Sequence, residues 1–159
     1  ARILNAVTSV NEDQKQRLYE HAKNRFDTLS DKTFAVWGLS FKPRTDDVRE
    51  APALTNIRRL CEAGASIKAT DPEAIDNARE ALSDLDNIEF YADDYEVLRG
   101  ADGLFIFTEW EEFRNPEFGQ MADLMERPII FDGRNLFEPE DMRNTSFEYI
   151  CIGRPIVEQ

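Results

Sequence analysis

The chain has 159 residues, which is enough for one compact domain with a substantial core and short for two. It contains no internal repeat and no apolar run long enough to span a bilayer. Its formal net charge of -13 would repel a phosphate backbone or an anionic lipid surface, so neither nucleic acid nor a membrane is expected as a partner.

An amphipathic helix is predicted at the start of the chain. From Ile3 to Phe26 apolar residues recur at spacings of three, four or eight, with polar and charged residues between them. At 1.5 Å per residue such a helix would extend roughly 35 to 40 Å. Its pattern is already running at Ala1 without a capping residue. We therefore expect residues 1–29 to be the end of a longer helix that lies across a partner subunit or connects domains. An ordinary helix packed on its own domain would show the same pattern.

After Ser30 the pattern changes to short β-rich runs that alternate with helical stretches, as in βαβ units around a parallel sheet. The predicted strands are Thr33–Ser40, Ser66–Thr70, Ile88–Ala92, Gly103–Thr108, Pro128–Asp132 and Phe147–Ile152. The first predicted helix has Pro52 near its start and Gly64 just past its end, and the others are Glu73–Leu85, Asp94–Arg99, Pro116–Glu126 and Pro139–Asn144. Residues 30–159 therefore predict an α/β domain with a Rossmann-like, doubly wound, mainly parallel sheet of about six strands.

The segment after the first strand is a long loop with three cations. Ligands on such sheets bind beyond the carboxyl ends of the strands. The loop has no G-x-G-x-x-G turn, so a dinucleotide pyrophosphate is not expected to bind to its backbone amides. Lys42, Arg44 and Arg49 lie within eight positions and could bind a small anionic ligand. They could equally neutralise the acidic residues of a solvated loop, and spacing alone leaves both interpretations open.

Three later strand ends carry further candidates. Asp71, followed by Pro72, is interpreted as a helix N-cap rather than a ribose-binding acid, because the glycine turn is missing. Trp110 could stack on a base or sugar, or pack against its own fold. Arg134 follows the fifth strand and should reach the same sheet edge as Lys42, where two cations would suit a diphosphate.

The cysteines and the histidine carry little functional signal. Cys61 and Cys151 lie in separate apolar segments without metal-ligand or disulfide spacing, which favours buried thiols in a reducing, cytoplasmic setting. His21 lies in a helical stretch far from other candidate ligands. Neither a metal site nor a histidine-based catalytic site is expected.

Taken in order, these loops resemble a known family over nearly the whole chain. The series is Gly38-Leu39-Ser40-Phe41-Lys42-Pro43-Arg44-Thr45-Asp46-Asp47-Val48-Arg49-Glu50-Ala51-Pro52, Asp71-Pro72, Thr108-Glu109-Trp110, Asp132-Gly133-Arg134-Asn135 and Ile152-Gly153-Arg154-Pro155. It is similar to the C-terminal, UDP-binding domain of the UDP-glucose/GDP-mannose dehydrogenase family. The opening segment around Asn11 also resembles the end of that family's central dimerisation helix.

The resemblance implies an NAD-dependent oxidation of the C6 alcohol of a nucleotide-linked sugar, through an adduct on a cysteine of the N-terminal half. It implies that Phe41, Lys42 and Arg134 contact the UDP-sugar substrate and that Arg49 reaches NAD. NAD would be bound mainly by the chain's own N-terminal domain, and the protein would be a homodimer through the long helix. No catalytic residue is expected here, so this segment alone would be inactive. Thr108-Glu109-Trp110 and Glu112-Phe113-Arg114 look more like the UDP-glucose branch than the GDP-mannose or N-acetylated-sugar branches.

Two other classes remain as alternatives. A signalling receiver domain is also a small acidic α/β sheet, but it needs an acidic pair at the end of the first strand, where this chain has Phe41 and Lys42. A non-catalytic dimerisation module would depend on the long helix, with the sheet as a scaffold.

Overall fold

The computed structural model describes residues 16–159, so the part of the predicted N-terminal helix that covers residues 1–15 lies outside the described residues. The sheet has six strands, and every neighbouring pair is parallel. The strands are β1 (Thr33–Trp37), β2 (Ser66–Thr70), β3 (Ile88–Phe90), β4 (Gly103–Ile106), β5 (Ile129–Asp132) and β6 (Glu148–Cys151). The predicted α/β, Rossmann-like class is confirmed.

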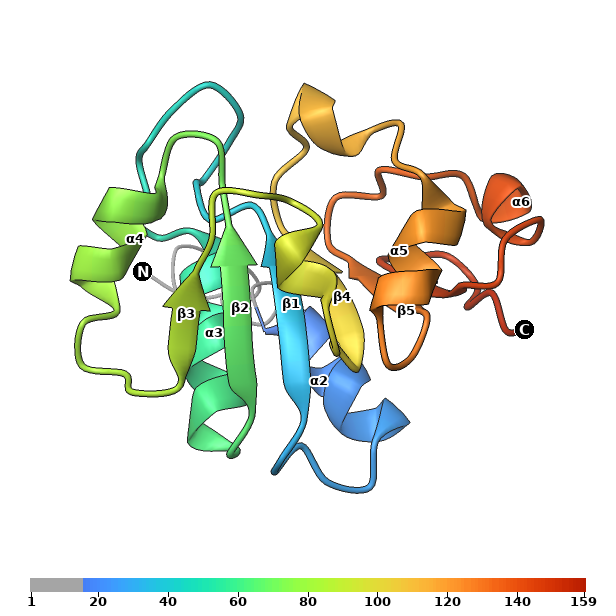
Figure 1. Ribbon diagram of the computed structural model, residues 1–159, viewed down its shortest axis with the longest axis horizontal. Helices are drawn as coiled ribbons and strands as arrows, with labels where there is room; N and C mark the ends of the chain where they lie inside the picture. Colours follow the sequence, from blue (N-terminus) through green and yellow to red (C-terminus); the bar gives the residue numbers. More distant parts are fainter. Residues whose placement is uncertain (1–15) are drawn as a thin grey trace, which may run out of the picture.

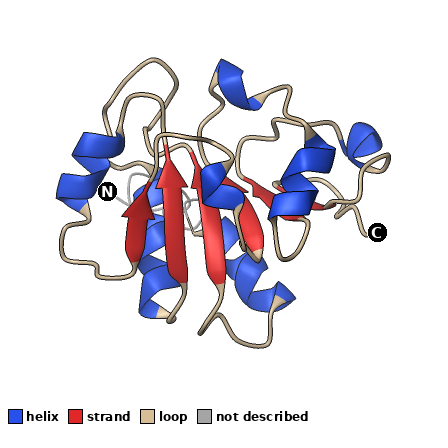
Figure 2. Cartoon of the chain, in the orientation of Figure 1, coloured by secondary structure: helices blue, strands red, loops and turns tan. Residues whose placement is uncertain are grey.

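The helices are short and cover both faces of this sheet (Figures 1 and 2). The α-helices are α2 (Arg17–Arg25), α3 (Pro52–Glu62), α4 (Ile75–Ala81), α5 (Phe118–Leu124) and α6 (Pro139–Met142). Two 3-10 turns complete the set, η1 (Glu96–Leu98) and η2 (Glu111–Phe113). α2 and α3 lie behind the sheet in Figure 1, and η1 and α5 lie in front of it.

The strand order is β3-β2-β1-β4-β5-β6, so the chain reverses its direction of growth between β1 and β4. In sheets of this kind, ligands bind outside the carboxyl ends of the strands, near that reversal. The strands point upward in Figure 1, and the loops above them carry the residues predicted to bind a ligand. Topology therefore places the loops after β1 and β4 side by side.

Two apolar cores, one on each face, explain why several strands are continuous apolar runs. β5 is buried along its whole length, with Ile130 facing one core and Phe131 the other. Phe131 stacks on Phe105 with ring centroids 4.7 Å apart, while on the other face Trp37 stacks on Phe113 at 5.0 Å. Side chains thus pack against both faces of the sheet, and this packing holds the strand ends at the carboxyl edge in place.

α2 packs into the core that contains Phe131. Leu18, Tyr19 and Ala22 are buried, and the backbone N–H of Tyr19 donates to Asn56 Oδ1 on α3 at 2.9 Å. A Cβ added at Gly133 would lie 2.9 Å from Leu18 Cδ1, so the absence of a side chain there lets α2 approach the end of β5. The division at residue 29 and the extension of this helix across a partner stay predictions.

Some predicted boundaries were too long, for identifiable local reasons. The first strand ends at Trp37 because Gly38 has a φ of 96°, and its N–H donates to Thr70 O at 2.9 Å. The predicted helix over Glu73–Leu85 is reduced to α4, because residues 71–74 form a turn around the Asp71 side chain. The predicted helix over Asp94–Arg99 is only the turn η1.

Candidate functional site at the carboxyl edge of the sheet

The first loop, residues 38–51, carries three of the predicted contact residues. Phe41 is one of the few large apolar side chains that are exposed, at 52%. Lys42 is exposed and forms no ion pair within the described part of the chain. Arg49 is 88% exposed and pairs with Asp47 of the same loop, Nη2 to Oδ2 at 3.0 Å. These side chains are therefore accessible, and the ion pair of Arg49 is internal to the loop.

The Arg49 pair has a clear electrostatic consequence. Hydrogen bonds from the Arg49 side chain and backbone lower the pKa of Asp47 to about 2. This supports part of the alternative interpretation of the loop, because one of its three cations does neutralise an acid. Lys42 forms no ion pair among the described residues, although its charge also helps to lower the pKa of Asp47.

The β5 loop, residues 133–137, carries Arg134. Its backbone N–H donates to Asp132 Oδ1 at 2.8 Å, and its guanidinium binds both carboxylate oxygens of Glu109, with Nη2 to Oε1 at 3.0 Å. The pair is partly accessible, since the Arg134 and Glu109 side chains are 41% and 24% exposed. The sequence analysis did not identify Glu109 as the partner of Arg134. The position of Glu109 directly after β4, the strand next to β5, was the feature that could have indicated this pair.

Asp132 organises this loop from below. Its side chain is fully buried, Oδ1 accepts from Arg134 N, and Oδ2 accepts from Leu136 N at 2.7 Å and from the Tyr149 hydroxyl at 2.6 Å. Burial raises the pKa of Asp132, and the donors that surround it act in the opposite direction. The acid is thus a structural support of the Arg134 backbone, a role the sequence did not reveal.

A cavity of about 170 Å³ opens beside Arg134. α2, α3 and the ends of β4, β5 and β6 contribute its lining residues, which are Leu18, Pro52, Asn56, Phe107, Gly133, Arg134 and Ile152. Phe41, Lys42 and Arg49 are not among them. The structure brings Arg134 and Lys42 to the same edge of the sheet, two strands apart, but not into one preformed pocket.

The segment Thr108 to Trp110, which follows β4 between the two loops, contacts both of them. Thr108 Oγ1 donates to Ser40 O at 2.7 Å, and Trp110 Nε1 donates to Asp71 Oδ2 at 3.2 Å. Glu109, between them, pairs with Arg134. Trp110 is 6% exposed, so of its two predicted roles the structure supports packing within the fold.

The remaining candidates are buried or isolated. Cys61 and Cys151 are free and buried, and burial raises the pKa of the Cys61 thiol to about 11. Burial and the nearby Arg17 lower the pKa of His21. Within residues 16–159 no group of three or more His, Cys, Asp or Glu side chains could hold a metal ion. In the same range, no helix has the length and hydropathy to cross a bilayer.

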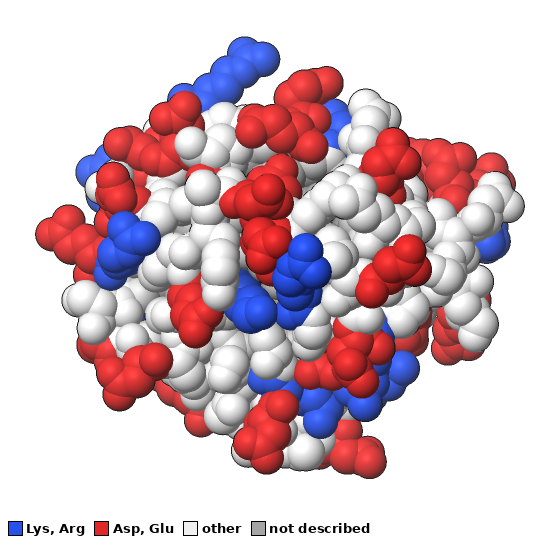
Figure 3. Space-filling model, in the orientation of Figure 1, with Lys and Arg blue, Asp and Glu red and all other residues white. Residues whose placement is uncertain are grey.

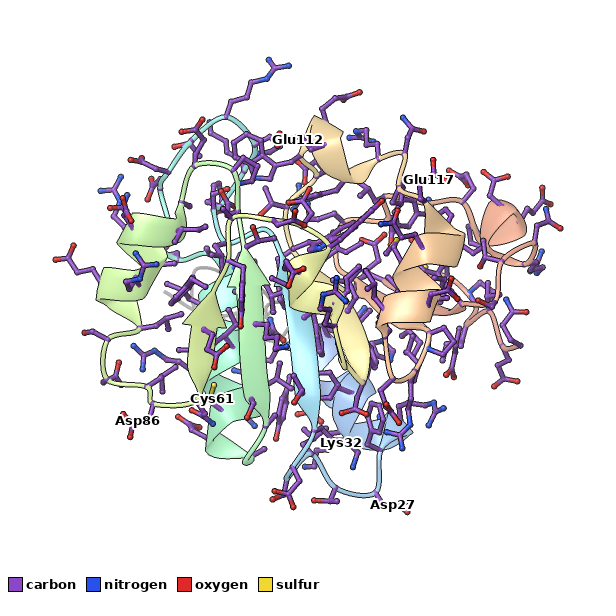
Figure 4. The ribbon with its side chains drawn as sticks, viewed as in Figure 1. Asp27, Lys32, Cys61, Asp86, Glu112 and Glu117 are labelled. Atoms are coloured by element: carbon purple, nitrogen blue, oxygen red, sulfur yellow. The ribbon has the colours of Figure 1, made fainter. Side chains whose placement is uncertain are left out.

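Charge is distributed unevenly over the molecule. Acidic side chains outnumber basic ones on the face shown in Figure 3, in line with the net charge of -13, and basic side chains lie in small groups between them. A basic side chain projects from the top edge, where the loops after the strands lie. Figure 4 shows Glu112 and Glu117 at this upper edge and Asp27, Lys32 and Asp86 at the lower edge. On this face a ligand anion would therefore meet cations only in these small groups.

The strand order, the missing glycine turn and the cations at the carboxyl edge together define a Rossmann-like domain suited to an anionic ligand other than a dinucleotide held on the first turn. Comparison with known proteins specifies the class further. Residues 35–139 match the model of the UDP-glucose/GDP-mannose dehydrogenase family, UDP binding domain. The chain belongs to this family, as its loop motifs predicted.

Individual relatives agree with this assignment. The chain is 38% identical over 156 residues to the UDP-glucose 6-dehydrogenase TuaD of Bacillus subtilis, covering 98% of this chain and 33% of that protein. It is also 38% identical over 167 residues to the UDP-glucose 6-dehydrogenase of Pseudomonas aeruginosa, covering 98% and 35%. The chain therefore spans about a third of the length of these relatives.

Solved structures show the same fold. A UDP-glucose dehydrogenase from Pyrobaculum islandicum superposes with a TM-score of 0.76 at 29% identity, over 92% of this chain and 31% of that one. The UDP-N-acetyl-mannosamine dehydrogenase Cap5O from Staphylococcus aureus superposes with a TM-score of 0.72 at 25% identity, over 97% and 34%.

Proposed function

We propose that this chain binds the UDP part of a nucleotide sugar for a UDP-glucose 6-dehydrogenase, which oxidises UDP-glucose to UDP-glucuronate with two NAD+. The observation that carries the proposal is that Lys42 and Arg134 project from the loops after β1 and β5, at one edge of the sheet. The 38% identity to UDP-glucose 6-dehydrogenases over almost the whole chain supports the same substrate.

The chemistry of the two cations suits a diphosphate. Lys42 offers a mobile point charge, whereas Arg134 offers a planar fork that can bind two phosphate oxygens at once. Phe41 exposes its ring next to Lys42 and would contact the sugar or base. In the free chain Glu109 occupies the fork of Arg134, so a bound phosphate must displace this carboxylate or share the guanidinium with it.

The redox chemistry would take place elsewhere in the whole protein. The two cysteines described here are buried, and the raised pKa of Cys61 makes it a poor nucleophile, so the cysteine that forms the substrate adduct would lie outside this segment. NAD would be bound mainly by the N-terminal domain, and exposed Arg49 would reach it across the cleft. The segment alone would therefore bind but not oxidise a UDP-sugar, and a cytoplasmic homodimer remains part of this proposal.

Calorimetric titration of the chain with UDP and with UDP-glucose tests the proposal. We expect Lys42→Ala and Arg134→Ala each to weaken UDP binding by roughly tenfold, since each removes one charge-assisted contact. Lys32→Ala and Arg99→Ala are matched controls, because Lys32 precedes β1 and Arg99 precedes β4, at the opposite end of the sheet. If the two site variants bound UDP as tightly as the controls, the assignment of Lys42 and Arg134 would be wrong.

A different sugar nucleotide is the main competing substrate. The structural similarity to a UDP-N-acetyl-mannosamine dehydrogenase leaves room for a UDP-N-acetylhexosamine, and the family name includes GDP-mannose. Parallel titrations with UDP-glucose, UDP-N-acetylglucosamine and GDP-mannose rank these ligands. Tighter binding of GDP-mannose would contradict the assignment to UDP-glucose.

The dimerisation role of the N-terminal helix needs a separate measurement. Sedimentation of the full chain and of a version starting at Ser30 compares their oligomeric states. Loss of a dimer with retention of fold would support the helix as the interface. Because α2 buries Leu18 and Tyr19 in the core, we expect the shortened version to be less stable, and circular dichroism checks that it is folded under the conditions of the measurement.

A further inference from the structure

A buried carboxylate at the end of β2 lies beneath the first loop. Asp71 is 4% exposed, and its Oδ2 accepts the backbone N–H groups of Leu39 at 2.7 Å and Ser40 at 3.2 Å. The indole N–H of Trp110, from the segment after β4, donates to the same oxygen at 3.2 Å. One oxygen thus holds together three segments that are far apart in the sequence.

The other oxygen of Asp71 serves its own strand end. Oδ1 accepts the backbone N–H groups of Glu73 and Ala74, both at 2.8 Å, which closes the turn before α4. Asp71 was predicted to be the N-cap of this helix, but α4 begins at Ile75 with Ala74 as its N-cap, so Asp71 closes the turn that precedes the helix. The hydroxyl of Ser40 also lies 3.2 Å from Oδ2 and 3.0 Å from the carbonyl oxygen of Lys42, within reach of both acceptors.

The two oxygens of a carboxylate offer about four lone-pair positions. Backbone and indole N–H groups already fill them here, and the site is closed to solvent. In a dinucleotide-binding sheet of this topology, an acid at the end of the second strand binds the ribose of the cofactor. In this chain the first loop itself occupies that acid, so the equivalent position cannot accept a ribose.

We propose that Asp71 is a positioning residue for the nucleotide diphosphate, because it fixes the root of the first loop from which Phe41 and Lys42 project. Leu39 and Ser40, the residues that Asp71 holds, immediately precede these two contact residues. Thr108 adds a second anchor through the carbonyl oxygen of Ser40. With the root fixed, only the few bonds beyond Ser40 must be ordered when Lys42 meets a phosphate, which lowers the entropic cost of binding.

The informative variant is Asp71→Ser. A serine hydroxyl can still accept from the turn amides of Glu73 and Ala74, but it is too short to reach Leu39 and Ser40 on the other side. We expect UDP binding by the chain to weaken by roughly tenfold. Asp71→Asn is the second variant, because its single amide oxygen can serve only one of the two sets of donors.

Two further measurements report on the anchor without any ligand. Amide hydrogen exchange of Leu39 and Ser40 should accelerate in Asp71→Ser. The chain has two tryptophans, and the Trp37 indole donates instead to the backbone carbonyl of Asp94, so the indole region of a ¹H–¹⁵N spectrum contains an internal reference. The Trp110 indole signal should move in the variant while the Trp37 signal stays in place.

Asp102→Asn is the matched control. Asp102 is also a mostly buried carboxylate, 9% exposed, and it accepts from the backbone N–H of Thr33 and from the Arg127 guanidinium at the amino end of the sheet. We expect its loss to reduce stability but to leave UDP affinity unchanged.

This inference rests on the proposed function, yet the two can fail separately. If the unaltered chain does not bind UDP, the proposed function is wrong, and the exchange and indole measurements still decide whether Asp71 holds the loop. If the unaltered chain binds UDP and Asp71→Ser binds it equally well, or if Asp102→Asn weakens binding as much, the positioning role is refuted.

Discussion

The two loops that carry the proposed diphosphate contacts are held in opposite ways. The β5 loop is held along its length: Asp132 accepts two of its backbone N–H groups, and Asn135 exchanges two hydrogen bonds with the backbone of Ile152. Asn135 takes up a φ of 51°, a left-handed conformation that asparagine tolerates well. The first loop is instead fixed at its root and makes mostly internal contacts beyond Ser40.

If Lys42 and Arg134 bind a diphosphate as proposed, this difference predicts that they contribute to the binding free energy in different ways. Arg134 starts from a fixed backbone and a defined side-chain position against Glu109, so little ordering is needed when it meets a phosphate. Lys42 starts on an exposed segment and must be ordered. A rigid fork and a mobile charge can together accept several diphosphate geometries, which suits a site that a second domain would complete.

The strongest test of this contrast removes the support of the β5 loop. Asp132→Ala should lower the free energy of unfolding by about 3 kcal/mol, because the Tyr149 hydroxyl and two backbone N–H groups lose a buried acceptor. Urea unfolding measures the change. Tyr149→Phe removes one donor to Asp132 and the hydroxyl that accepts from the Phe137 backbone N–H, and should cost about 1 kcal/mol.

For the first loop, in contrast, we expect that removing a carboxylate leaves the free energy of unfolding unchanged. Asp47→Ala is the matched change there, and its urea midpoint should equal that of the unaltered chain, because the Asp47–Arg49 pair is solvent-exposed. If Asp47→Ala were as destabilising as Asp132→Ala, the two loops would not differ in the way the contacts indicate.

The architecture was largely predictable from the sequence because its signals are local. Apolar β-rich runs, Pro52 at a helix start and Gly64 past its end define β1, α3 and β2 without any tertiary information. The lengths of η1 and α4 were not predictable, because they depend on side-chain acceptors supplied by Asp93 and Asp71 at the preceding turns.

The site was only partly predictable for a related reason. Strand ends indicate which residues reach the edge of the sheet, so Lys42 and Arg134 could be selected. The partner of each could not, because a carboxylate after one strand can pair with its own loop, as Asp47 does, or with a neighbouring one, as Glu109 does. Sequence spacing does not distinguish these cases, and burial of Asp71 and Asp132 is visible only in three dimensions.

A smaller effect is expected at Glu109, where one negative charge beside Arg134 can be removed while the backbone contacts of the β5 loop are kept. Glu109→Gln keeps an oxygen that can accept from the Arg134 guanidinium but removes a negative charge that competes with phosphate. We expect UDP to bind about threefold more tightly at low salt and the gain to shrink as salt is added. Calorimetry at two salt concentrations measures both effects.

Glu111→Gln is the control for that change, because Glu111 lies on the same segment and pairs instead with Arg114 at 3.5 Å. Its affinity for UDP should stay within error of the unaltered chain. Weaker binding by Glu109→Gln would mean that the charge of Glu109 is needed to orient Arg134, and that the β5 loop is less rigid than its backbone contacts indicate.

The smallest effect concerns the tip of the first loop and is measured by titration. Hydrogen bonds from Arg49 lower the pKa of Asp47 from 3.8 to about 2, so the ion pair is intact above pH 4 and is lost as the pH falls from about 4 to about 2. Carboxyl-detected NMR should show Asp47 titrating near pH 2. In Arg49→Ala the pKa of Asp47 should rise towards its ordinary value without reaching it, because the backbone N–H of residue 49 still donates to the carboxylate. Arg44→Ala should leave the pKa low, because Arg44 does not contribute to the shift. An ordinary pKa for Asp47 in the unaltered chain would mean that Arg49 is already free in solution. A low pKa would mean that any NAD contact made by Arg49 must first compete with Asp47, so that cofactor binding and the conformation of the Lys42 loop are linked.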